Sequence, residues 1–273
     1  MTPLRIAVCI ASRNRPIALT GVIAGAWRLQ SGQNHIAFVV AADEDDARTI
    51  DACERIAKDG EIPLVLSVAP REPYLGAAQN RAAGMARDAD IVTLLSDRTF
   101  VTAPGWDAII ADATGAHPHR LLWWQGPDRD TVLPAIPRSY LDALGWRYSP
   151  ERFPYWFDDT WHTEIDRMAS GGPSLLCRAT YGGIRQKTTR LREVAFWTRL
   201  FVALRPERVR LAKTLADATG RPWSEPPETM LADFCARDGR LLANAARFDQ
   251  MFGDPAAPVE PEYLVARTAA EEM

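Results

Sequence analysis

The stretch Ile91–Trp106 reads IVTLLSDRTFVTAPGW, and it decides the fold of the chain. Its first five residues, Ile91–Leu95, are apolar or small and lack the alternation of a strand with one face in water. Such a run is typical of a strand buried on both faces, as in a parallel sheet covered by helices. The run stops before Asp97, and a loop then leads to a helix expected to begin near Gly105. Open α/β sheets bind ligands at the carboxyl ends of central strands. We therefore place Asp97 at the centre of a ligand site, and the alternative is an aspartate that only caps the next loop.

Upstream of this stretch, apolar runs alternate with segments of helical spacing. Strands are expected over Arg5–Ala11, His35–Ala42 and Pro63–Val68, and helices over Ile17–Leu29, Asp51–Ala57 and Leu75–Ala86. Strand–helix units joined by crossovers of about 20 to 30 residues predict a parallel sheet of the Rossmann type with helices on both faces. The fold class is thus α/β.

Downstream of Arg120 the pattern changes to short strands and then to helices. A fifth strand is expected over Leu121–Trp124, a short edge strand with a proline over Thr131–Ile136, and helices over Ser139–Leu144, Thr188–Ala218 and Met230–Phe252. The tail from Gly253 is rich in proline and glutamate and is expected to fray. We predict an α/β domain over residues 1–184 and a helical C-terminal extension over residues 185–273.

The composition bounds the class of protein. The 273 residues are 47% hydrophobic and 25% charged, as in ordinary globular proteins, and the net charge of −3 lacks the basic excess of nucleic-acid binders. Four scattered cysteines without a CxxC pair indicate reduced thiols. The first apolar run is shorter than that of a signal peptide, and no run approaches the roughly 18 apolar residues of a membrane span. We expect a cytoplasmic protein, with peripheral membrane contact left open.

A local basic excess lies between Arg185 and Lys213, where nine basic residues accompany two acidic ones. Such a segment can meet a pyrophosphate, an anionic acceptor or a membrane surface. The favoured interpretation is a solvated helical face, because runs of charge usually have that role.

Polar residues follow the predicted strands at the points where they end. These residues are Ser12 with Arg13, Asp43, Arg71 and Asp97. Because parallel strands end at one edge of a sheet, these side chains are expected to converge there. Arg13 and Arg15 can bind phosphate with paired hydrogen bonds, and Asp43 can accept one from a base N–H or a ribose hydroxyl. The alternative is that loops at strand ends are polar in any case.

A second chemical centre is Phe153–Met168, FPYWFDDTWHTEIDRM, which combines aromatic rings with carboxylates. Asp158 and Asp159 come just before a helix expected to start near Thr160. Paired carboxylates beside aromatic surface suit acid–base chemistry on a sugar, since one carboxylate can take the proton of an attacking hydroxyl. The aromatic faces would hold the apolar side of the ring. The alternative is an N-cap with a hydrophobic anchor.

These landmarks together resemble the family 2 glycosyltransferases with the GT-A fold, over roughly Arg5–Met168. RIAVCIASRNRP resembles the first strand and nucleotide-contacting loop of that family, and VVAADEDD resembles its second strand with a base- or ribose-contacting aspartate, here Asp43. LGAAQNRAAGMARDADIVTLLSD resembles its small-residue helix with an asparagine, here Asn80, and the strand that leads into the DxD motif. TAPGWD matches the usual continuation, and FDDTW resembles the acidic motif that supplies the catalytic base in inverting members.

The resemblance implies transfer of a sugar from a nucleoside-diphosphate sugar to the hydroxyl of a glycan, lipid or protein acceptor, with inversion. It implies catalysis by Asp159 or Asp158. The implied nucleotide-binding residues are Ser12, Arg13, Arg15, Asp43, Asn80 and Asp97. The implied acceptor- or sugar-binding residues are Trp156, Trp161 and Glu164. It also implies a divalent cation, Mn²⁺ or Mg²⁺, with Asp97 and His162 as candidate ligands.

The sequence departs from the family at the DxD motif, which here reads Asp97-Arg98-Thr99. Two carboxylates normally share the cation that neutralises the leaving diphosphate. With Thr99 in place of the second, Arg98 or the basic segment after Arg185 is an alternative source of positive charge. A GT-A domain that binds a nucleotide sugar or a partner without turnover is the main alternative function. A related nucleotidyltransferase would need a glycine-rich phosphate loop, which SRNRP lacks.

Overall fold

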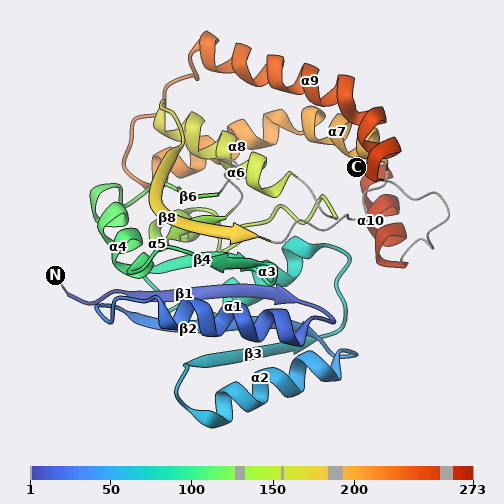
Figure 1. Ribbon diagram of the computed structural model, residues 1–273. Helices are drawn as coiled ribbons and strands as arrows, with labels where there is room; N and C mark the ends of the chain where they lie inside the picture. Colours follow the sequence, from blue (N-terminus) through green and yellow to red (C-terminus); the bar gives the residue numbers. More distant parts are fainter. Residues whose placement is uncertain (1, 127–132, 155–156, 184–192, 253–260, 273) are drawn as a thin grey trace.

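The computed structural model describes residues 2–126, 133–154, 157–183, 193–252 and 261–272 (Figure 1). The strands are β1 (Arg5–Ser12), β2 (His35–Asp43), β3 (Leu64–Ala69), β4 (Ile91–Ser96), β5 (Thr99–Val101), β6 (Leu122–Gln125), β7 (Pro134–Pro137) and β8 (Leu175–Gly183). The helices are α1 (Pro16–Arg28), α2 (Ala47–Asp59), α3 (Leu75–Met85), α4 (Trp106–Ala116), α5 (Arg138–Ala143), α6 (Asp158–Ser170), α7 (Val194–Ala203), α8 (Arg205–Ala218), α9 (Glu228–Phe252) and α10 (Pro261–Glu271).

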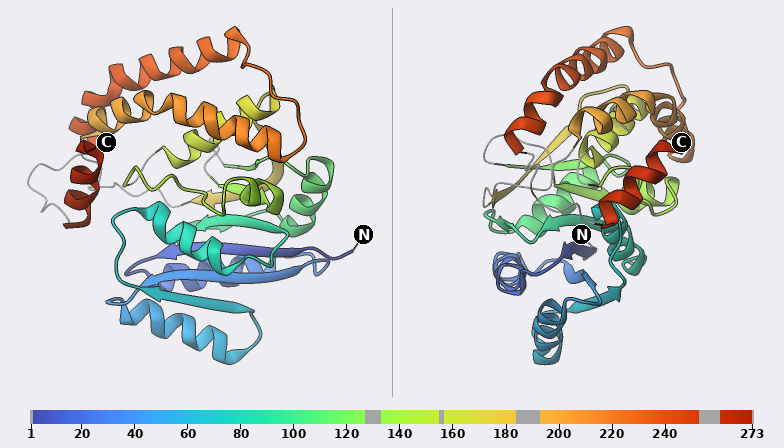
Figure 2. Two further views of the ribbon diagram at one scale, coloured as in Figure 1. Left: turned by 180° about the vertical axis from the view of Figure 1, so that it is seen from behind. Right: turned by 90° about the vertical axis from the view of Figure 1, so that its right-hand side faces the viewer.

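Over the described residues, the strands form one sheet in the order β3-β2-β1-β4-β7-β6-β8-β5. β1 runs parallel to both of its neighbours, with Cys9 opposite Val39 of β2 and Leu94 of β4, and β3 extends this parallel half. Helices α1, α2 and α4 pack on one face and α3, α5 and α6 on the other, so the interior strands are buried on both sides (Figure 2). The predicted parallel α/β sheet is confirmed. We call the side on which β1 to β4 end the carboxyl edge.

The second half of the sheet differs from the prediction. β7 was expected at an edge, yet it lies between β4 and β6 and is antiparallel to both. Its prolines, Pro134 and Pro137, stand at the two ends of a four-residue strand, where a missing N–H removes little of the ladder. Strands β5 and β8 have no clear apolar alternation and were not predicted. Thr131, the expected start of the strand, lies outside the described residues.

The C-terminal helices share a core with the α/β part. Residues of α7, α8, α9 and α10 belong to the same buried cluster as α3, α5 and α6. The expectation of a frayed tail is wrong for α10, because Tyr263, Ala266 and Ala270 form a buried helical face. The Trp197 indole of α7 donates to the Tyr263 hydroxyl at 3.1 Å. The predicted domain boundary after residue 184 lies at residues that the structure does not describe, so it stays a prediction. None of the described helices combines the length and apolar character needed to cross a membrane.

Candidate functional site

Asp97 follows β4 at the carboxyl edge and is held from two sides by the loop after β1. The Ser12 hydroxyl donates to Asp97 Oδ2 at 3.0 Å, and Arg15 Nη1 donates to Oδ1 at 3.1 Å. The Asp97 side chain is 6% exposed and that of Arg15 is 29% exposed. The structure thus brings together three of the predicted nucleotide-binding residues, from segments more than 80 residues apart.

The same loop also closes against the end of β2. Arg13 Nη1 donates to Asp43 Oδ2 at 2.7 Å, and its Nη2 donates to Asp45 Oδ2 at 2.8 Å. Asn14 has a positive φ of 57°, which asparagine tolerates, and its N–H donates to Asp46. Asp46 in turn accepts from Thr49 N–H and so caps α2. Arg13 and Asp43 therefore meet as predicted, but Arg13 already holds two carboxylates.

Thr99, at the position of the second DxD carboxylate, closes a local turn. Its hydroxyl donates to the Ser96 carbonyl oxygen at 2.8 Å and accepts from the Ser96 N–H at 3.0 Å. The Thr99 hydroxyl thus has both its donor and an acceptor position in use. Among the described residues, no group of three or more His, Cys, Asp and Glu side chains is arranged to hold a metal ion.

Asp158 and Asp159, which we call the acidic pair, are joined to α3 by hydrogen bonds that run through Ser149 to Asp158. Asn80 Nδ2 donates to the Ser149 carbonyl oxygen at 2.9 Å, and Ser149 N–H donates back to Asn80 Oδ1 at 2.8 Å. The Ser149 hydroxyl donates to Asp158 Oδ1 at 3.0 Å. A Cβ added at Gly76 would overlap this serine side chain, so the close approach requires glycine. Asn80 therefore orients Ser149, whose hydroxyl contacts Asp158, and the nucleotide contact of Asn80 stays a prediction.

The hydrogen bonds from α3 through Ser149 place the acidic pair beyond the carboxyl edge. Arg81, in α3, donates to the carbonyl oxygens of Ser67 at 2.7 Å and Ala42 at 3.4 Å, near the ends of β3 and β2. At about 1.5 Å of rise per residue, Gly76 lies roughly 7.5 Å further out along the helix. Both α3 and α6 begin on the side toward which the arrowheads of β1 and β2 point (Figures 1 and 2). The acidic pair and the cluster of Ser12, Arg15 and Asp97 thus both lie on the side of the molecule where β1 to β4 end.

The surroundings of the acidic pair favour bound protons. Burial raises the pKa of Asp158 to about 8, helped by the negative charges of Asp159 and Glu151 and opposed by the Ser149 hydrogen bond. Burial also raises the pKa of Asp159, against hydrogen bonds from Thr160 and the positive charge of Arg237. A carboxylate with a pKa near neutrality is a better proton acceptor than an ordinary aspartate.

Strain lies next to this pair. Phe157 has a φ of 77°, which is uncommon for a bulky residue, and it immediately precedes Asp158. Its ring is buried and stacks on Phe201 of α7, with the ring centroids 4.8 Å apart. Packing against the C-terminal helices therefore fixes the entry into α6.

Three predicted site residues, Trp161, Glu164 and His162, lie in the core. Trp161 is 1% exposed, and its ring lies among Phe153 and Phe201, so it offers no platform for a sugar. Glu164 is fully buried in ion pairs and offers no contact to an acceptor. These placements correct both assignments. Trp156, the remaining residue predicted to bind the sugar or acceptor, lies outside the described residues.

His162 is also a structural residue. Its Nδ1 lies 2.9 Å from the Tyr140 hydroxyl, and its Nε2 contacts the Tyr148 carbonyl oxygen. Since a carbonyl only accepts, Nε2 carries the proton and Nδ1 accepts from the tyrosine. Burial lowers the pKa of His162 to about 3, so the ring is neutral. With both nitrogens engaged, the assignment of His162 as a metal ligand is corrected.

Glu164 belongs to a set of charges that we call the buried ionic cluster. Its members are Glu164 of α6, Arg205 and Arg208 of α8, and Arg237 and Asp238 of α9. Arg208 is fully buried, donates to the Phe201 carbonyl oxygen and stacks 3.9 Å from the centroid of that ring. The expected solvated face is therefore wrong at Arg208. Arg185, Lys187, Arg190 and Arg192 of the same basic segment lie outside the described residues.

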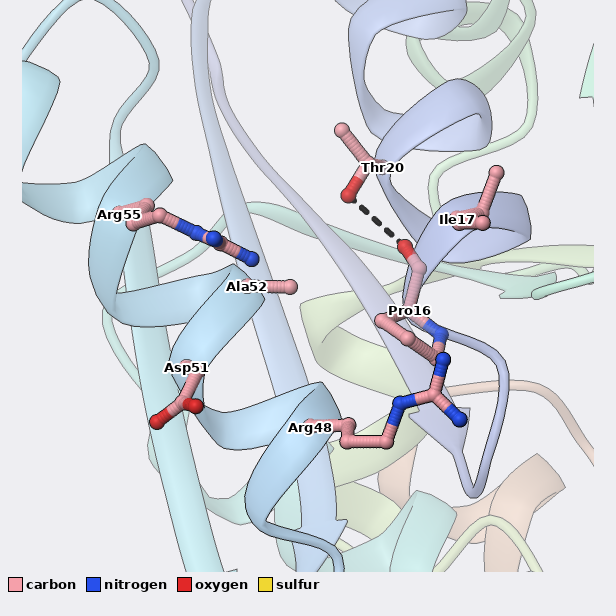
Figure 3. Close-up of a pocket in the computed structure, with 7 residues that line it drawn as sticks. All are labelled: Pro16, Ile17, Thr20, Arg48, Asp51, Ala52 and Arg55. Atoms are coloured by element: carbon pink, nitrogen blue, oxygen red, sulfur yellow. Dashed lines mark hydrogen bonds between the residues drawn. The ribbon is translucent and has the colours of Figure 1, made fainter.

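A separate pocket of about 380 Å³ lies between α1 and α2 (Figure 3). Arg48 and Arg55 of α2 face it, together with the first turns of α1. None of the predicted site residues lines it.

Sequence reasoning missed the residues that support the site. Ser149 and Glu151 lie in a loop without a recognisable motif. Asp46 ends the quoted stretch VVAADEDD, but only the three-dimensional contacts reveal its hydrogen bonds with Asn14 and Thr49. Gly76 had a signal, since it lies among the small residues of LGAAQNRAAG, which indicate a close approach. Arg237 is far along α9 and carries no pattern that links it to Asp159.

Comparison with known proteins bears on the fold. No protein-family model and no curated protein matches the chain by sequence. Among solved structures, the mannosyltransferase PcManGT from Pyrobaculum calidifontis, in complex with GDP-Man and Mn²⁺, is 16% identical with a TM-score of 0.61, over 99% of this chain and 80% of that one. GalNAc-T7 with UDP, GalNAc and Mn²⁺ is 13% identical with a TM-score of 0.61, over 86% and 58% of the two chains. S. aureus TarS 1–349 with UDP is 12% identical with a TM-score of 0.56, over 98% and 79%.

The chain has a GT-A-type fold. Each of these neighbours is a glycosyltransferase, and the similarity extends over nearly the whole chain in two of them. At identities this low, the likeness establishes the fold alone. The function must be argued from the site.

Proposed function

We propose that this chain is a glycosyltransferase that moves a sugar from a nucleoside-diphosphate sugar to an acceptor hydroxyl. The observation that carries the proposal is the hydrogen-bonded chain from Asn80 through Ser149 to Asp158. It holds an acidic pair on the same side of the sheet as the Ser12–Arg15–Asp97 cluster. A site for a diphosphate and a proton acceptor for the attacking hydroxyl are the two parts that the reaction needs.

In this proposal Asp158 and Asp159 act as a coupled pair. The acceptor hydroxyl gives its proton to a carboxylate of the pair while its oxygen attacks the anomeric carbon. The bond from that carbon to the diphosphate oxygen breaks, and the nucleoside diphosphate leaves. Burial raises the pKa of Asp158 to about 8, so its carboxylate is a stronger base than that of an ordinary aspartate once deprotonated, and turnover should rise as the pH approaches 8. One displacement inverts the anomeric centre.

The donor is held at the carboxyl edge. Asp43 accepts from the base or ribose, while Arg15 meets the diphosphate, as their positions beside β2 and β4 allow. The neighbours were solved with GDP-Man or UDP, which supports a nucleoside-diphosphate sugar as the donor class. Membership of family 2, cytoplasmic residence and peripheral membrane contact remain predictions.

A divalent cation is the expectation from two of the neighbours, which are complexes with Mn²⁺. The donor set of this chain does not fit one. Asp97 has both carboxylate oxygens in hydrogen bonds, and the Thr99 hydroxyl closes its own turn. The steps above therefore use only the chain's own residues.

The test is release of nucleoside diphosphate from UDP-glucose, UDP-GlcNAc, UDP-galactose and GDP-mannose. We expect one of these donors to be turned over, and Asp158→Asn and Asp159→Asn to lower the rate about 10²- to 10⁴-fold. Nucleotide binding, measured by thermal shift, should persist in both variants. Asp51→Asn, an exposed aspartate on α2, is the matched control and should keep the wild-type rate. Wild-type turnover in both acidic-pair variants would remove the pair from the mechanism.

A second candidate is a GT-A domain that binds a nucleotide sugar without turnover. The occupied oxygens of Asp97 and the threonine at position 99 favour it. This function would be supported if the chain binds a nucleoside diphosphate but releases no sugar from any donor when varied hydroxyl acceptors are present.

A further inference from the structure

The carboxylates at the carboxyl edge are already paired. Asp97 accepts from Ser12 and Arg15, Asp43 accepts from Arg13, and Asp46 accepts from two backbone N–H groups. A divalent cation such as Mg²⁺ or Ca²⁺ needs several oxygen ligands at about 2.0 to 2.6 Å. Freeing Asp97 for it would break an ion pair and a hydrogen bond without supplying a second carboxylate, because position 99 is a threonine.

Arg15 is the positive group that pairs with Asp97. Among the described residues, its guanidinium makes one hydrogen bond, to Asp97. Arginine carries five N–H donors, so four remain, and the side chain is 29% exposed. Asp97, whose side chain is 6% exposed, holds the guanidinium through Nη1 and leaves its other N–H groups available to a ligand. This is the arrangement in which arginine binds phosphate with two parallel hydrogen bonds.

The N-terminus of α1 adds positive charge to that of the Arg15 guanidinium. α1 begins at Pro16, directly after Arg15, and has neither a side-chain cap nor an acidic residue in its first turn. The partial positive charge of the helix terminus is therefore not offset locally. This helix terminus belongs to the same loop as Arg15 and likewise favours an anion.

We propose that this chain binds a nucleoside diphosphate without a divalent cation, and that Arg15, held by Asp97, takes the place of the cation against the diphosphate. The inference rests on the proposed function, since it concerns the same site. Asp97 with a divalent cation would carry a net charge of +1, whereas Asp97 with Arg15 is neutral. The affinity for nucleotide is accordingly modest and insensitive to chelators.

The test is calorimetric titration of UDP and GDP into the full chain, in EDTA and then in Mn²⁺. We expect the Kd of the bound nucleotide to agree within about twofold between the two buffers. Arg15→Ala should weaken binding about tenfold or more in both, the loss expected for a hydrogen bond between charged groups. Arg15→Lys keeps the charge and guards against misfolding of the alanine variant, and it should bind with intermediate affinity. Arg28→Ala, an exposed arginine in the last turn of α1 and at the opposite end of that helix from Arg15, is the matched control and should leave the Kd unchanged.

A gain of cation dependence provides the converse test. Arg15→Ala combined with Thr99→Asp removes the guanidinium and restores the second carboxylate. This double variant should bind Mn²⁺, seen as loss of the free-ion signal in electron paramagnetic resonance, and its nucleotide affinity should then require Mn²⁺. The wild-type chain should leave the free-ion signal unchanged.

The outcomes separate the two proposals. Nucleotide binding by the wild type only in Mn²⁺ would overturn the inference and leave the proposed function standing. Binding in EDTA that Arg15→Ala and Arg15→Lys leave unchanged would overturn the role of Arg15. Absence of nucleoside-diphosphate binding in both buffers would defeat the proposed function, and this inference with it.

Discussion

The carboxyl edge and the buried ionic cluster are built from the same chemical parts, arginine paired with carboxylate. At the edge, Arg15 keeps 29% of its side chain exposed and has donors to spare. In the cluster, Arg208 and Glu164 have no exposed side-chain surface, and helices α8 and α9 close over them. The comparison teaches that accessibility, and not residue type, separates a binding arginine from a structural one. Accessibility is decided by elements that lie far away in the sequence.

Helix α6 connects the two regions. Its first turn carries Asp158 and Asp159, and Glu164, in its middle, is the acceptor for Arg208 and Arg237. Arg237 also lowers the proton affinity of Asp159 through its charge. The cluster therefore fixes the helix on which the acidic pair is mounted.

The largest expected effect comes from breaking the buried cluster. Glu164→Gln leaves Arg208 as an uncompensated buried charge, so unfolding should become easier by about 3 to 5 kcal/mol. The measurement is the free energy of unfolding in urea. Glu164→Leu combined with Arg208→Met removes both charges and should recover most of the loss. A loss below about 1 kcal/mol in the single variant would place the cluster with ordinary surface pairs.

A smaller effect is expected where α3 meets the acidic segment. Gly76→Ala puts a methyl group into the space of the Ser149 side chain. That side chain is held in place because its hydroxyl donates to Asp158 and accepts from the Glu151 N–H. Overpacking of this kind costs about 1 to 3 kcal/mol, and turnover should fall because Asp158 must shift. Gly84→Ala on the same helix has open space around the added Cβ and should stabilise the helix slightly. Equal stability of both variants would contradict the close approach.

Much of the fold could be predicted because local patterns decide it. The unbroken apolar runs of β1, β2 and β4 are the direct mark of strands covered on both faces, and the structure confirms the parallel sheet. The interior position of β7 and the helix α10 escaped prediction because their neighbours decide them. β7 is held between β4 and β6 despite its two prolines, and α10 is held by the packing of Tyr263 against Trp197.

The site was predictable only in part, for a similar reason. Strand ends of a parallel sheet must converge, so the meeting of Ser12, Arg15 and Asp97 followed from topology. Trp161 and Glu164 have the residue types of a sugar site, but helices α7 to α9 bury them. No pattern within the segment FDDTWHTE states what will pack on it.

A further expected effect depends on pH and concerns Asp158. The pKa of Asp158 rises from an ordinary value near 4 in the unfolded chain to about 8 in the folded one, so the folded state binds the proton more tightly. This contribution to stability is complete below about pH 4 and is lost as the pH rises to about 8. Asp158→Asn lacks it. We therefore expect the Tm of the variant, relative to wild type, to increase between pH 4 and pH 8, by about 2 to 4 °C for each kcal/mol. A pH-independent difference would mean that Asp158 keeps an ordinary pKa.

The smallest expected effect on stability comes from the edge itself. Arg13→Ala removes the ion pairs with Asp43 and Asp45. The side chains of Arg13, Asp43 and Asp45 are 23%, 13% and 58% exposed, and partly exposed pairs contribute about 0 to 1 kcal/mol each. The same variant frees Asp43, so nucleotide binding should change more than stability does. Urea unfolding and calorimetric titration with UDP and GDP measure the two effects on one sample. A loss of stability as large as that of Glu164→Gln would show that the edge is part of the structural framework, and the distinction between the two regions would fail. A small loss of stability with altered binding would instead favour nucleotide binding at the accessible pairs, where Arg15 keeps N–H donors for a phosphate while Asp97 holds it.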